Sequence, residues 1–422
     1  MRKIILGALV AMVLAACAKE EASIAKIEEV KNPYAVTTDE AVQLLQTVIG
    51  GESTRAISVG EIKTLRKSDF VPTTRGADDG DLIYIVDLEN GGSAIMGADK
   101  RMEPIYAILD ETKVSPEQLT LSATRSDDGE QDIEEYVMGL VNAKIGADAN
   151  SFIIDPPFIK DSLPIPSLRP ETWTETTTLG QKLPMLETKW NQWYPYNSVY
   201  CQTYGYVNQP VGCAVIAISQ IMAYHNMNMT NTNFNWNIIN NFTPGYANVA
   251  SEGEKTYIGN YVYQVRQAIT SNPMEAIGIN QVALFMTLKT NYENISYTSY
   301  SRSSTVSMLN NDNPVYIRGH ESGDNEGHAW VIDGYHYYKI DEWERSYIGT
   351  IVDEEEIVAT YYYDLLHCNY GWLGKCDGYY TEGIFDPEHL RDSDEMDTSI
   401  GDWAGTEPHT FDTALTIIQY SK

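Results

Sequence analysis

The chain has 422 residues and a formal net charge of −30, and 43% of its residues are hydrophobic. This length predicts two or three domains, and the hydrophobic content is sufficient for buried cores. The acidic excess argues against a nucleic-acid ligand, because a phosphate backbone needs lysine or arginine to neutralise it, and we interpret the charge as promoting solubility outside the cell.

Residues 1–17 have the pattern of an export signal. A basic start, Arg2-Lys3, precedes an apolar stretch from Ile4 to Leu14 that is too short to span a membrane by itself. Small residues followed by Cys17 resemble a bacterial lipoprotein signal, in which Cys17 becomes the acylated first residue. Ordinary signal-peptidase cleavage near Ala16, with Cys17 incidental, is the alternative.

No later segment is apolar enough to span a bilayer, so we expect an exported protein that contacts the membrane through a lipid anchor only. The tract Lys19-Glu20-Glu21 after the anchor residue is similar to acidic tracts that send some lipoproteins to the cell surface. We therefore expect a location at the outer membrane or cell surface of a Gram-negative bacterium.

Residues 18–155 have the pattern of a small α+β domain. Thr37-Thr38-Asp39-Glu40 opens an apolar-periodic run, which predicts a short capped helix. The runs Ile83–Val86 and Ser93–Met96 flank Asn90-Gly91-Gly92, which indicates a hairpin. We expect a further strand from Ile105 to Leu109 and a helix around Tyr136 to Ile145.

Residues 156–180 have the composition of an exposed, extended linker. Prolines crowd the segment up to Pro170, and a threonine-rich run follows from Thr172 to Thr178. Exposed linkers are where proteolytic nicking concentrates, so we expect a processing site here, between about Lys160 and Leu183.

Residues 181–422 are expected to form a second α+β domain. One strongly apolar segment, Ala214 to Tyr224, is long enough for a helix. Short strand patterns follow it, and a helix followed by a sheet indicates an α+β fold. The expected strands are Pro314–Ile317, His328–Tyr338, Glu356–Asn369, Gly378–Ile384 and Thr410–Ile418.

Cys213 is the candidate nucleophile. It follows Gly212 at the start of the apolar helix, where outward-pointing N–H groups and the helix dipole favour thiolate over thiol. A nucleophilic cysteine requires such a lowered pKa. Taken alone, the alternative is a small cysteine buried in the core.

The other cysteines carry less information. An even count in an exported protein is compatible with disulfides, and Cys368 and Cys376 are the pair that could bridge, although a chain this long does not need them. Neither CxxC nor a Cys/His pair at zinc spacing occurs, so we expect no metal and no cofactor.

His328 is the candidate base among seven histidines, because it starts a strand after a glycine-rich polar loop. Its alternative is an ordinary exposed loop histidine, and His320, His336 and His367 are expected to be structural. Asn369, at a strand end, is expected to orient His328. Gln192 and the Cys213 N–H are expected to stabilise the oxyanion. The residues expected to shield or line the cleft are Trp372, Tyr370 and Trp330.

The order Gln, Cys, His, Asn is that of papain-type peptidases, and the combined pattern resembles the streptopain family of cysteine peptidases over roughly residues 30–420. The segments that carry the resemblance are Trp190-Asn191-Gln192 with Pro195-Tyr196-Asn197, Gly212-Cys213-Ala214, Gly327-His328-Ala329 with Ile332-Asp333-Gly334, Asn369–Tyr380, and Leu82–Val86 with Gly97–Arg101.

The resemblance implies a papain-like catalytic domain with Cys213 as nucleophile, His328 as base, Asn369 orienting His328 and Gln192 serving the oxyanion. It also implies that the N-terminal domain is an inhibitory propeptide covering the cleft, and that the substrates are proteins or peptides. The chain departs from the family at Tyr370, where a Trp is usual, and at Leu373-Gly374, where a Gly pair is usual. A papain-like acyl transferase and a catalytically silent surface protein that binds peptides are the rival interpretations.

Overall fold

The computed structural model describes residues 34–49, 58–70, 80–89, 91–120, 133–154, 171–320, 327–348, 351–385 and 413–422. From Val36 to Lys422 the chain forms one compact unit. Cys17 and the rest of the export signal lie outside the described residues, as do residues 156–170 of the predicted linker. In the described part of the chain, none of the helices combines the length and apolarity needed to cross a membrane.

The fold combines helices with one antiparallel sheet of 11 strands, as expected for the α+β class. The strand order is β1-β2-β3-β4-β10-β9-β8-β7-β11-β6, and β5 pairs with β8 outside this path. The strands are β1 (Val59–Arg66), β2 (Asp81–Leu88), β3 (Ser93–Gly97), β4 (Ala107–Leu109), β5 (Glu171–Lys182), β6 (Glu293–Ser299), β7 (Val315–His320), β8 (Gly327–Ile348), β9 (Ile351–Asn369), β10 (Gly378–Thr381) and β11 (Thr413–Ser421).

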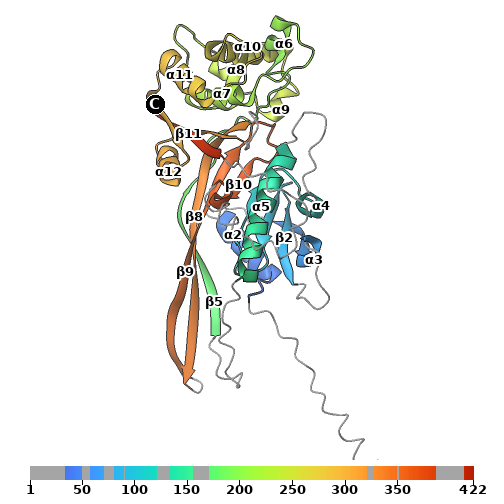
Figure 1. Cartoon of the computed structure of the whole chain (residues 1–422), viewed down its shortest axis with the longest axis vertical. Helices are drawn as coiled ribbons and strands as arrows, with labels where there is room; N and C mark the ends of the chain where they lie inside the picture. Colours follow the sequence, from blue (N-terminus) through green and yellow to red (C-terminus); the bar gives the residue numbers. More distant parts are fainter. Residues whose placement is uncertain are drawn as a thin grey trace, which may run out of the picture. The chain divides into compact units, whose positions relative to one another are not determined.

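The helices fall into an N-terminal and a C-terminal group, and α6 to α11 lie together at one end of the sheet (Figure 1). In chain order they are α2 (Thr38–Ile49), α3 (Lys67–Phe70), α4 (Pro116–Thr120), α5 (Ile133–Ile154), α6 (Ser198–Tyr204), α7 (Cys213–His225), α8 (Trp236–Asn240), α9 (Pro244–Ala247), α10 (Glu252–Ile269), α11 (Ile279–Lys289), α12 (Arg302–Asn310) and the 3-10 helix η2 (Glu382–Phe385).

The N-terminal elements confirm most of the local predictions. Thr37 caps α2 through a reciprocal pair of hydrogen bonds, in which the Thr37 N–H donates to the Glu40 carboxylate (2.7 Å) and the Glu40 N–H donates to the Thr37 hydroxyl (3.2 Å). The β2–β3 hairpin and β4 lie where they were expected, and α5 is longer than predicted. Strand β1 was missed, because its mostly polar sequence has little apolar alternation.

The sheet runs without a break from the N-terminal elements into the C-terminal ones. Strand β4 pairs with β10 in the register Leu109↔Gly378 and Ala107↔Tyr380. Hydrogen bonds extend this ladder, because the Asp110 N–H donates to the Asp377 carbonyl at 3.0 Å. Residues 36–154 therefore share a sheet with the part of the chain that contains the candidate site.

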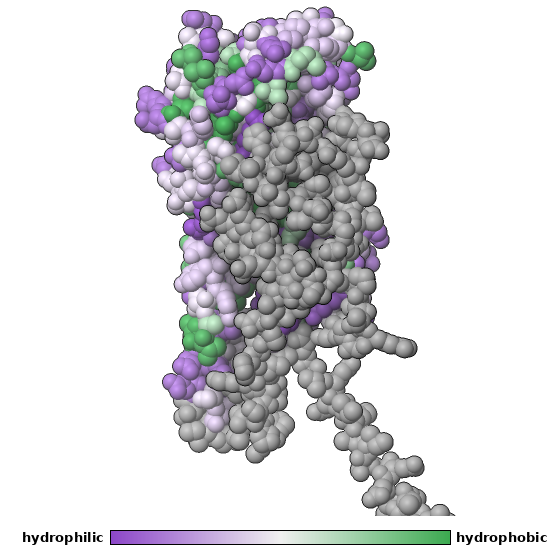
Figure 2. Space-filling model, viewed as in Figure 1, coloured by the Kyte–Doolittle hydropathy of each residue, from purple (hydrophilic) through white to green (hydrophobic). Residues whose placement is uncertain are grey.

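Strands β8 and β9 form a ribbon longer than the two strands predicted there. Their pairing extends from Val331↔Asn369 to Ile348↔Ile351, and Figure 1 shows the ribbon continuing beyond the rest of the sheet. Figure 2 shows apolar residues among hydrophilic ones along the side that β9 occupies. The exposed apolar residues of β9 include Ile357, which is 45% exposed.

Strand β5 lies along this ribbon, and it contains most of the threonine-rich part of the predicted linker. It pairs with β8 from Lys182↔Tyr335 to Glu171↔Arg345. Trp173 stacks on Trp343 across the pair, with 5.9 Å between ring centroids. The segment is extended and mostly exposed as expected, but its backbone is hydrogen-bonded, and the predicted end of the linker at residue 180 falls inside it.

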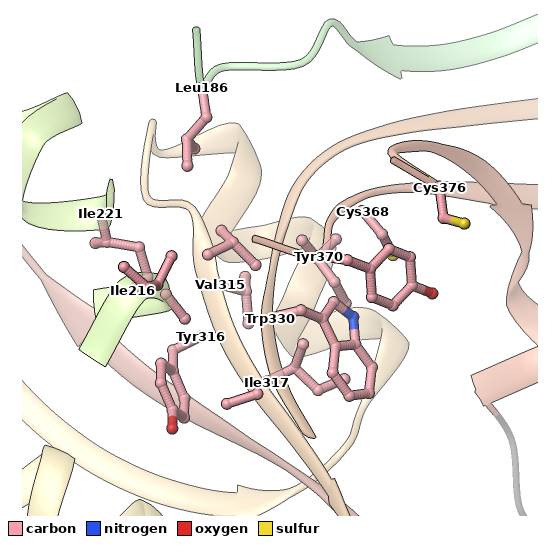
Figure 3. Close-up of a cluster of buried hydrophobic side chains, with 14 of the residues drawn as sticks. Leu186, Ile216, Ile221, Val315, Tyr316, Ile317, Trp330, Cys368, Tyr370 and Cys376 are labelled. Atoms are coloured by element: carbon pink, nitrogen blue, oxygen red, sulfur yellow. The ribbon is translucent and has the colours of Figure 1, made fainter. Parts of the chain in front are cut away.

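Helix α7 lies in the core against the sheet. Every residue of α7 except Cys213 and Tyr224 is buried, which confirms the predicted apolar helix. Figure 3 shows Ile216 and Ile221 of α7 beside the segment of β7 that contains Val315 and Tyr316. Full burial of each such isoleucine contributes roughly 1.5–3 kcal/mol, so the helix that begins at Cys213 is firmly held.

Candidate active site

Cys213 is the first residue of α7, and the glycine before it makes the approach to the helix possible. Gly212 has φ 105° and ψ 135°, a conformation that side-chain-bearing residues rarely adopt. Its carbonyl accepts the first helical hydrogen bonds, from the Val215 N–H (3.1 Å) and the Ile216 N–H (3.2 Å). Cys213 itself is half-buried and heads a stable helix, where the dipole favours a negative charge.

Cys213 lines a cavity of about 390 Å³ together with Gln192 and His328. Burial raises the pKa of the Cys213 thiol. A hydrogen bond from the His328 side chain, the charge of His328, a backbone hydrogen bond from Ala329 and the charge of Arg318 outweigh this effect and lower the pKa to about 7. A large fraction of Cys213 is therefore thiolate near neutral pH, as nucleophilic catalysis requires.

His328 is the second residue of β8 and is half-buried beside Cys213. Its Nε2 lies 3.0 Å from the carbonyl oxygen of Tyr370. A carbonyl oxygen can only accept, so Nε2 carries the hydrogen, and Nδ1 is the nitrogen that can exchange a proton with Cys213. This hydrogen bond fixes the tautomer that a base acting on the thiol needs.

The three aromatic residues assigned to shielding surround the imidazole of His328. Trp330 lies parallel to the ring at 6.1 Å between centroids, Tyr370 at 6.3 Å, and Trp372 is tilted at 6.5 Å. Trp330 and Tyr370 are each 1% exposed. They exclude water from one side of the His328–Tyr370 hydrogen bond, which strengthens it by lowering the local dielectric.

Asn369 is buried at the end of β9, next to Tyr370, and its amide connects three segments. Its Nδ2 donates to the Thr188 carbonyl (2.8 Å), and its Oδ1 accepts from Gln220 Nε2 and from the Gly371 N–H, both at 3.1 Å. The hydrogen bond that orients His328 in this structure is donated by its Nε2 to the neighbouring main-chain carbonyl, that of Tyr370, and not to Asn369 as expected. Asn369 is therefore placed to hold the loop that carries this carbonyl.

Gln192 lines the cavity, as its expected contact with a substrate oxyanion requires. The Asn191 side chain accepts a hydrogen bond from the Trp193 N–H (3.1 Å), and the Gln192 carbonyl accepts one from the Val211 N–H (2.9 Å). These bonds fix the turn around Gln192 and connect it to the residues just before Cys213.

No family model and no curated protein matches this chain. Among solved structures, the chain is similar to a fragment of Prevotella intermedia prointerpain A, a mutant with one cysteine replaced by alanine. The TM-score is 0.47 and the sequence identity 16%, over 85% of this chain and 100% of that one.

The remaining histidines with described side chains are His225, His336 and His367, and all three have structural surroundings. The buried His225 ring contacts the Tyr292 hydroxyl (3.0 Å) and the Asp312 carbonyl (2.9 Å). Buried His336 contacts the Thr178 hydroxyl across the β5–β8 pair, and burial lowers its pKa to about 4. Burial alone would lower the pKa of His367, but the carboxylates of Asp333 (2.6 Å) and Asp110 (3.3 Å) raise it to about 10. None of these three rings lines the cavity.

The cysteines with described surroundings, Cys201, Cys213, Cys368 and Cys376, are all free thiols, so the considered bridge between Cys368 and Cys376 does not form. Burial raises the pKa of the Cys368 thiol well above its usual range, which makes Cys368 inert, in contrast to Cys213. Over the ranges that the structure describes, no cluster of three or more metal-ligating side chains occurs.

Two residues of the site were missed in the sequence. Gln220 is fully buried in α7, where its Oε1 accepts from the Trp190 N–H (3.1 Å) and its Nε2 donates to Asn369. A glutamine inside an otherwise apolar helix was a usable signal, because a buried amide needs polar partners. Arg318 of β7 also lines the cavity, and nothing in its local sequence marks it.

Proposed function

We propose that this chain is a cysteine peptidase with a papain-like catalytic part that hydrolyses amide bonds of proteins or peptides. The observation that carries the proposal is the pair formed by Cys213 and His328 in one cavity. The thiol heads a buried helix, its pKa is lowered to about 7 mainly through His328, and Gln192 lies on the cavity wall. Lowered thiol pKa and a positioned base are the two requirements of thiol nucleophilic catalysis.

The proposed reaction has two halves. The Cys213 thiolate bonds to the substrate carbonyl carbon, and the oxyanion is stabilised by the Gln192 side chain and the Cys213 N–H. The C–N bond breaks as His328 Nδ1 gives its proton to the leaving amine, which leaves an acyl-thioester. Water then attacks the thioester, gives a proton to His328, and releases the acid and the thiolate.

The test compares Cys213→Ala with Cys201→Ser, a matched change at a second free thiol that lies outside the catalytic pair. Casein cleavage and labelling by an epoxide thiol probe are measured for both. We expect Cys213→Ala to lose both activities and Cys201→Ser to keep them. Cleavage by Cys213→Ala at the wild-type rate would refute the nucleophile. The probe labels an enzyme but not a silent binding protein, and product mass separates hydrolysis from acyl transfer.

The proposal includes export as a lipoprotein precursor with Cys17 as the lipidated residue and residues 18–155 as an inhibitory propeptide. None of the described residues between 36 and 154 lines the cavity. Two of their contacts lie beside the loop after Asn369: the Thr112 hydroxyl accepts from the Cys376 N–H (2.9 Å), and Asp110 contacts His367. These contacts support the proposal that the propeptide controls the loop whose Tyr370 carbonyl orients His328.

Maturation is proposed to occur in residues 160–170, immediately before β5. A protease needs an accessible extended backbone, and that of β5 is hydrogen-bonded to β8 along its length. The mature protein should therefore retain β5. N-terminal sequencing of the processed protein tests this, and a start inside residues 80–120 would contradict the division into propeptide and peptidase.

A further inference from the structure

Arg318 lies at the edge of the candidate site, where its charge helps to lower the pKa of Cys213, and the mechanism above gives it no contact with the substrate. On β7 it stands opposite Ala329 of β8, and its neighbour Gly319 stands opposite His328. Its side chain lines the cavity that contains Cys213 and is 8% exposed. The cavity wall next to the nucleophile therefore contains a buried cation.

The guanidinium of Arg318 has unused hydrogen-bonding capacity. Nη1 donates to the Ile277 carbonyl at 2.6 Å, and among the described residues Arg318 has no ion pair with a carboxylate. A guanidinium carries several further N–H donors in a planar fork. In the described structure, each Arg318 nitrogen that lacks a hydrogen-bond partner is accessible to solvent. Because the side chain lines the cavity, these donors reach the space of the cavity.

Arg266, the second arginine of the cavity wall, is used differently. Its guanidinium donates to the carbonyls of Val211 (3.0 Å), Pro273 (2.7 Å) and Glu275 (3.2 Å). It also lies 5.1 Å from the centre of the Tyr200 ring. Arg266 therefore connects several segments of the cavity wall through main-chain carbonyls, whereas Arg318 makes only one hydrogen bond to a main-chain carbonyl among the described residues.

The fixed charges of the cavity wall favour an anion. Arg266 and Arg318 are positive, and Glu275, whose carboxylate accepts a hydrogen bond from the Thr270 hydroxyl, is the acidic residue lining this cavity among the described ones. The described lining residues thus carry a net positive charge in a chain with a net charge of −30. Apart from the Cys213 thiolate, whose pKa its charge helps to lower, Arg318 has no anionic partner among the described residues. A ligand carboxylate would offset the cost of burying this cation.

We infer that Arg318 binds a carboxylate of the peptide substrate, either an acidic side chain near the scissile bond or the carboxylate at the chain terminus. This inference rests on the proposed peptidase function and names a substrate class for it. A carboxylate matches the planar fork of the guanidinium and can accept two N–H bonds at once, whereas an amide of the same shape cannot supply the charge.

The first experiment measures kcat/KM of the processed enzyme for matched peptides. One pair differs by Glu or Gln at a single position, scanned along an internally quenched peptide, and the other pair ends in a free acid or an amide. We expect at least about a tenfold preference for the carboxylate in one pair, as one charge-assisted hydrogen bond provides. The pair that shows it identifies the source of the carboxylate.

The preference should disappear in Arg318→Gln and be partly restored in Arg318→Lys. Arg318→Gln also removes a charge near Cys213, but that effect changes both peptides of a pair equally, so the ratio isolates binding. Arg302→Gln, which breaks a partly exposed pair with Asp364 outside the cavity, is the matched control and should keep the preference. Equal cleavage within both pairs, or a preference that survives Arg318→Gln, overturns the inference.

A binding measurement separates this inference from the proposed function. Calorimetry with the full chain carrying Cys213→Ala should show tighter binding of the carboxylate peptide, and adding Arg318→Gln should abolish the difference. If the wild-type enzyme cleaves nothing while this difference persists, the peptidase proposal fails and the carboxylate site stands. If peptides are cleaved but the difference is absent, the carboxylate site fails.

Discussion

Replacing His328 by glutamine tests the physical basis of the thiol's acidity. Glutamine keeps a donor for the Tyr370 carbonyl but loses the charge. Burial of Cys213 would then be opposed by the Ala329 hydrogen bond and the Arg318 charge, so its pKa should rise from about 7 to its ordinary value of about 9 or higher. Two pKa units correspond to about 2.7 kcal/mol of lost thiolate stabilisation.

This shift has a measurable size at neutral pH. With a pKa of about 7, roughly half of Cys213 is thiolate at pH 7, whereas with a pKa of about 9 roughly 1% is, a difference of about fiftyfold. The assay is the alkylation rate of Cys213 by iodoacetamide as a function of pH, followed by mass spectrometry of the peptide that contains it. The midpoint of the profile reports the pKa independently of the nucleophilicity of each thiolate.

The control is the same titration in Cys201→Ser, which should leave the midpoint near 7. If the midpoint in His328→Gln also stays near 7, His328 is not what lowers the pKa of Cys213. The helix terminus and Arg318 would then carry the effect, and the assignment of His328 as base would lose its main support.

Two further changes test the surroundings of the site. Asp110→Asn removes one carboxylate that raises the pKa of His367 to about 10, a stabilisation that is complete below about pH 6.5 and lost as pH rises through about 10. Because Asp110 is about one third exposed, the free energy of unfolding measured in urea should fall by about 1 kcal/mol near pH 6, and this loss should fade above pH 10. An equal loss at pH 6 and above pH 10 would contradict the link to the protonation of His367. Gln220→Leu leaves the buried Trp190 N–H without its acceptor and should cost about 1–3 kcal/mol and lower kcat more than KM. Ser219→Ala, where the buried hydroxyl has no partner in the described structure, is its control and should show neither effect.

The parts of the site that depend on local sequence could be predicted. Gly212 before an apolar run indicated where α7 begins, and the glycine-rich loop before His328 indicated where β8 begins. Both features are determined by residues within a few positions, through backbone freedom and hydrophobic periodicity. The capping of α2 by Thr37 was predictable for the same reason.

The parts that depend on distant pairing could not be predicted. The residues of β5 were predicted to be part of a linker, because their threonine-rich sequence has little apolar alternation and does not indicate a strand. Their pairing partner, β8, follows more than 150 residues later in the chain. Likewise, the cavity is assembled from segments between Gln192 and Trp372. The position of Arg318 in its wall therefore depends on residues of other elements and could not be predicted from the local sequence. The orientation of His328 by the Tyr370 carbonyl could not be predicted either, because every residue has a main-chain carbonyl and the sequence does not indicate which one accepts this hydrogen bond.

The ladder between β4 and β10 has a consequence for the timing of the proposed activation. A nick in residues 160–170 breaks one peptide bond and leaves that ladder, and the shared hydrophobic cluster around it, intact. The severed N-terminal piece then remains a tightly held subunit, and its departure is a dissociation whose rate depends on opening the interface rather than on cutting the chain. Activity should consequently lag behind cleavage, and the freed piece should be able to rebind.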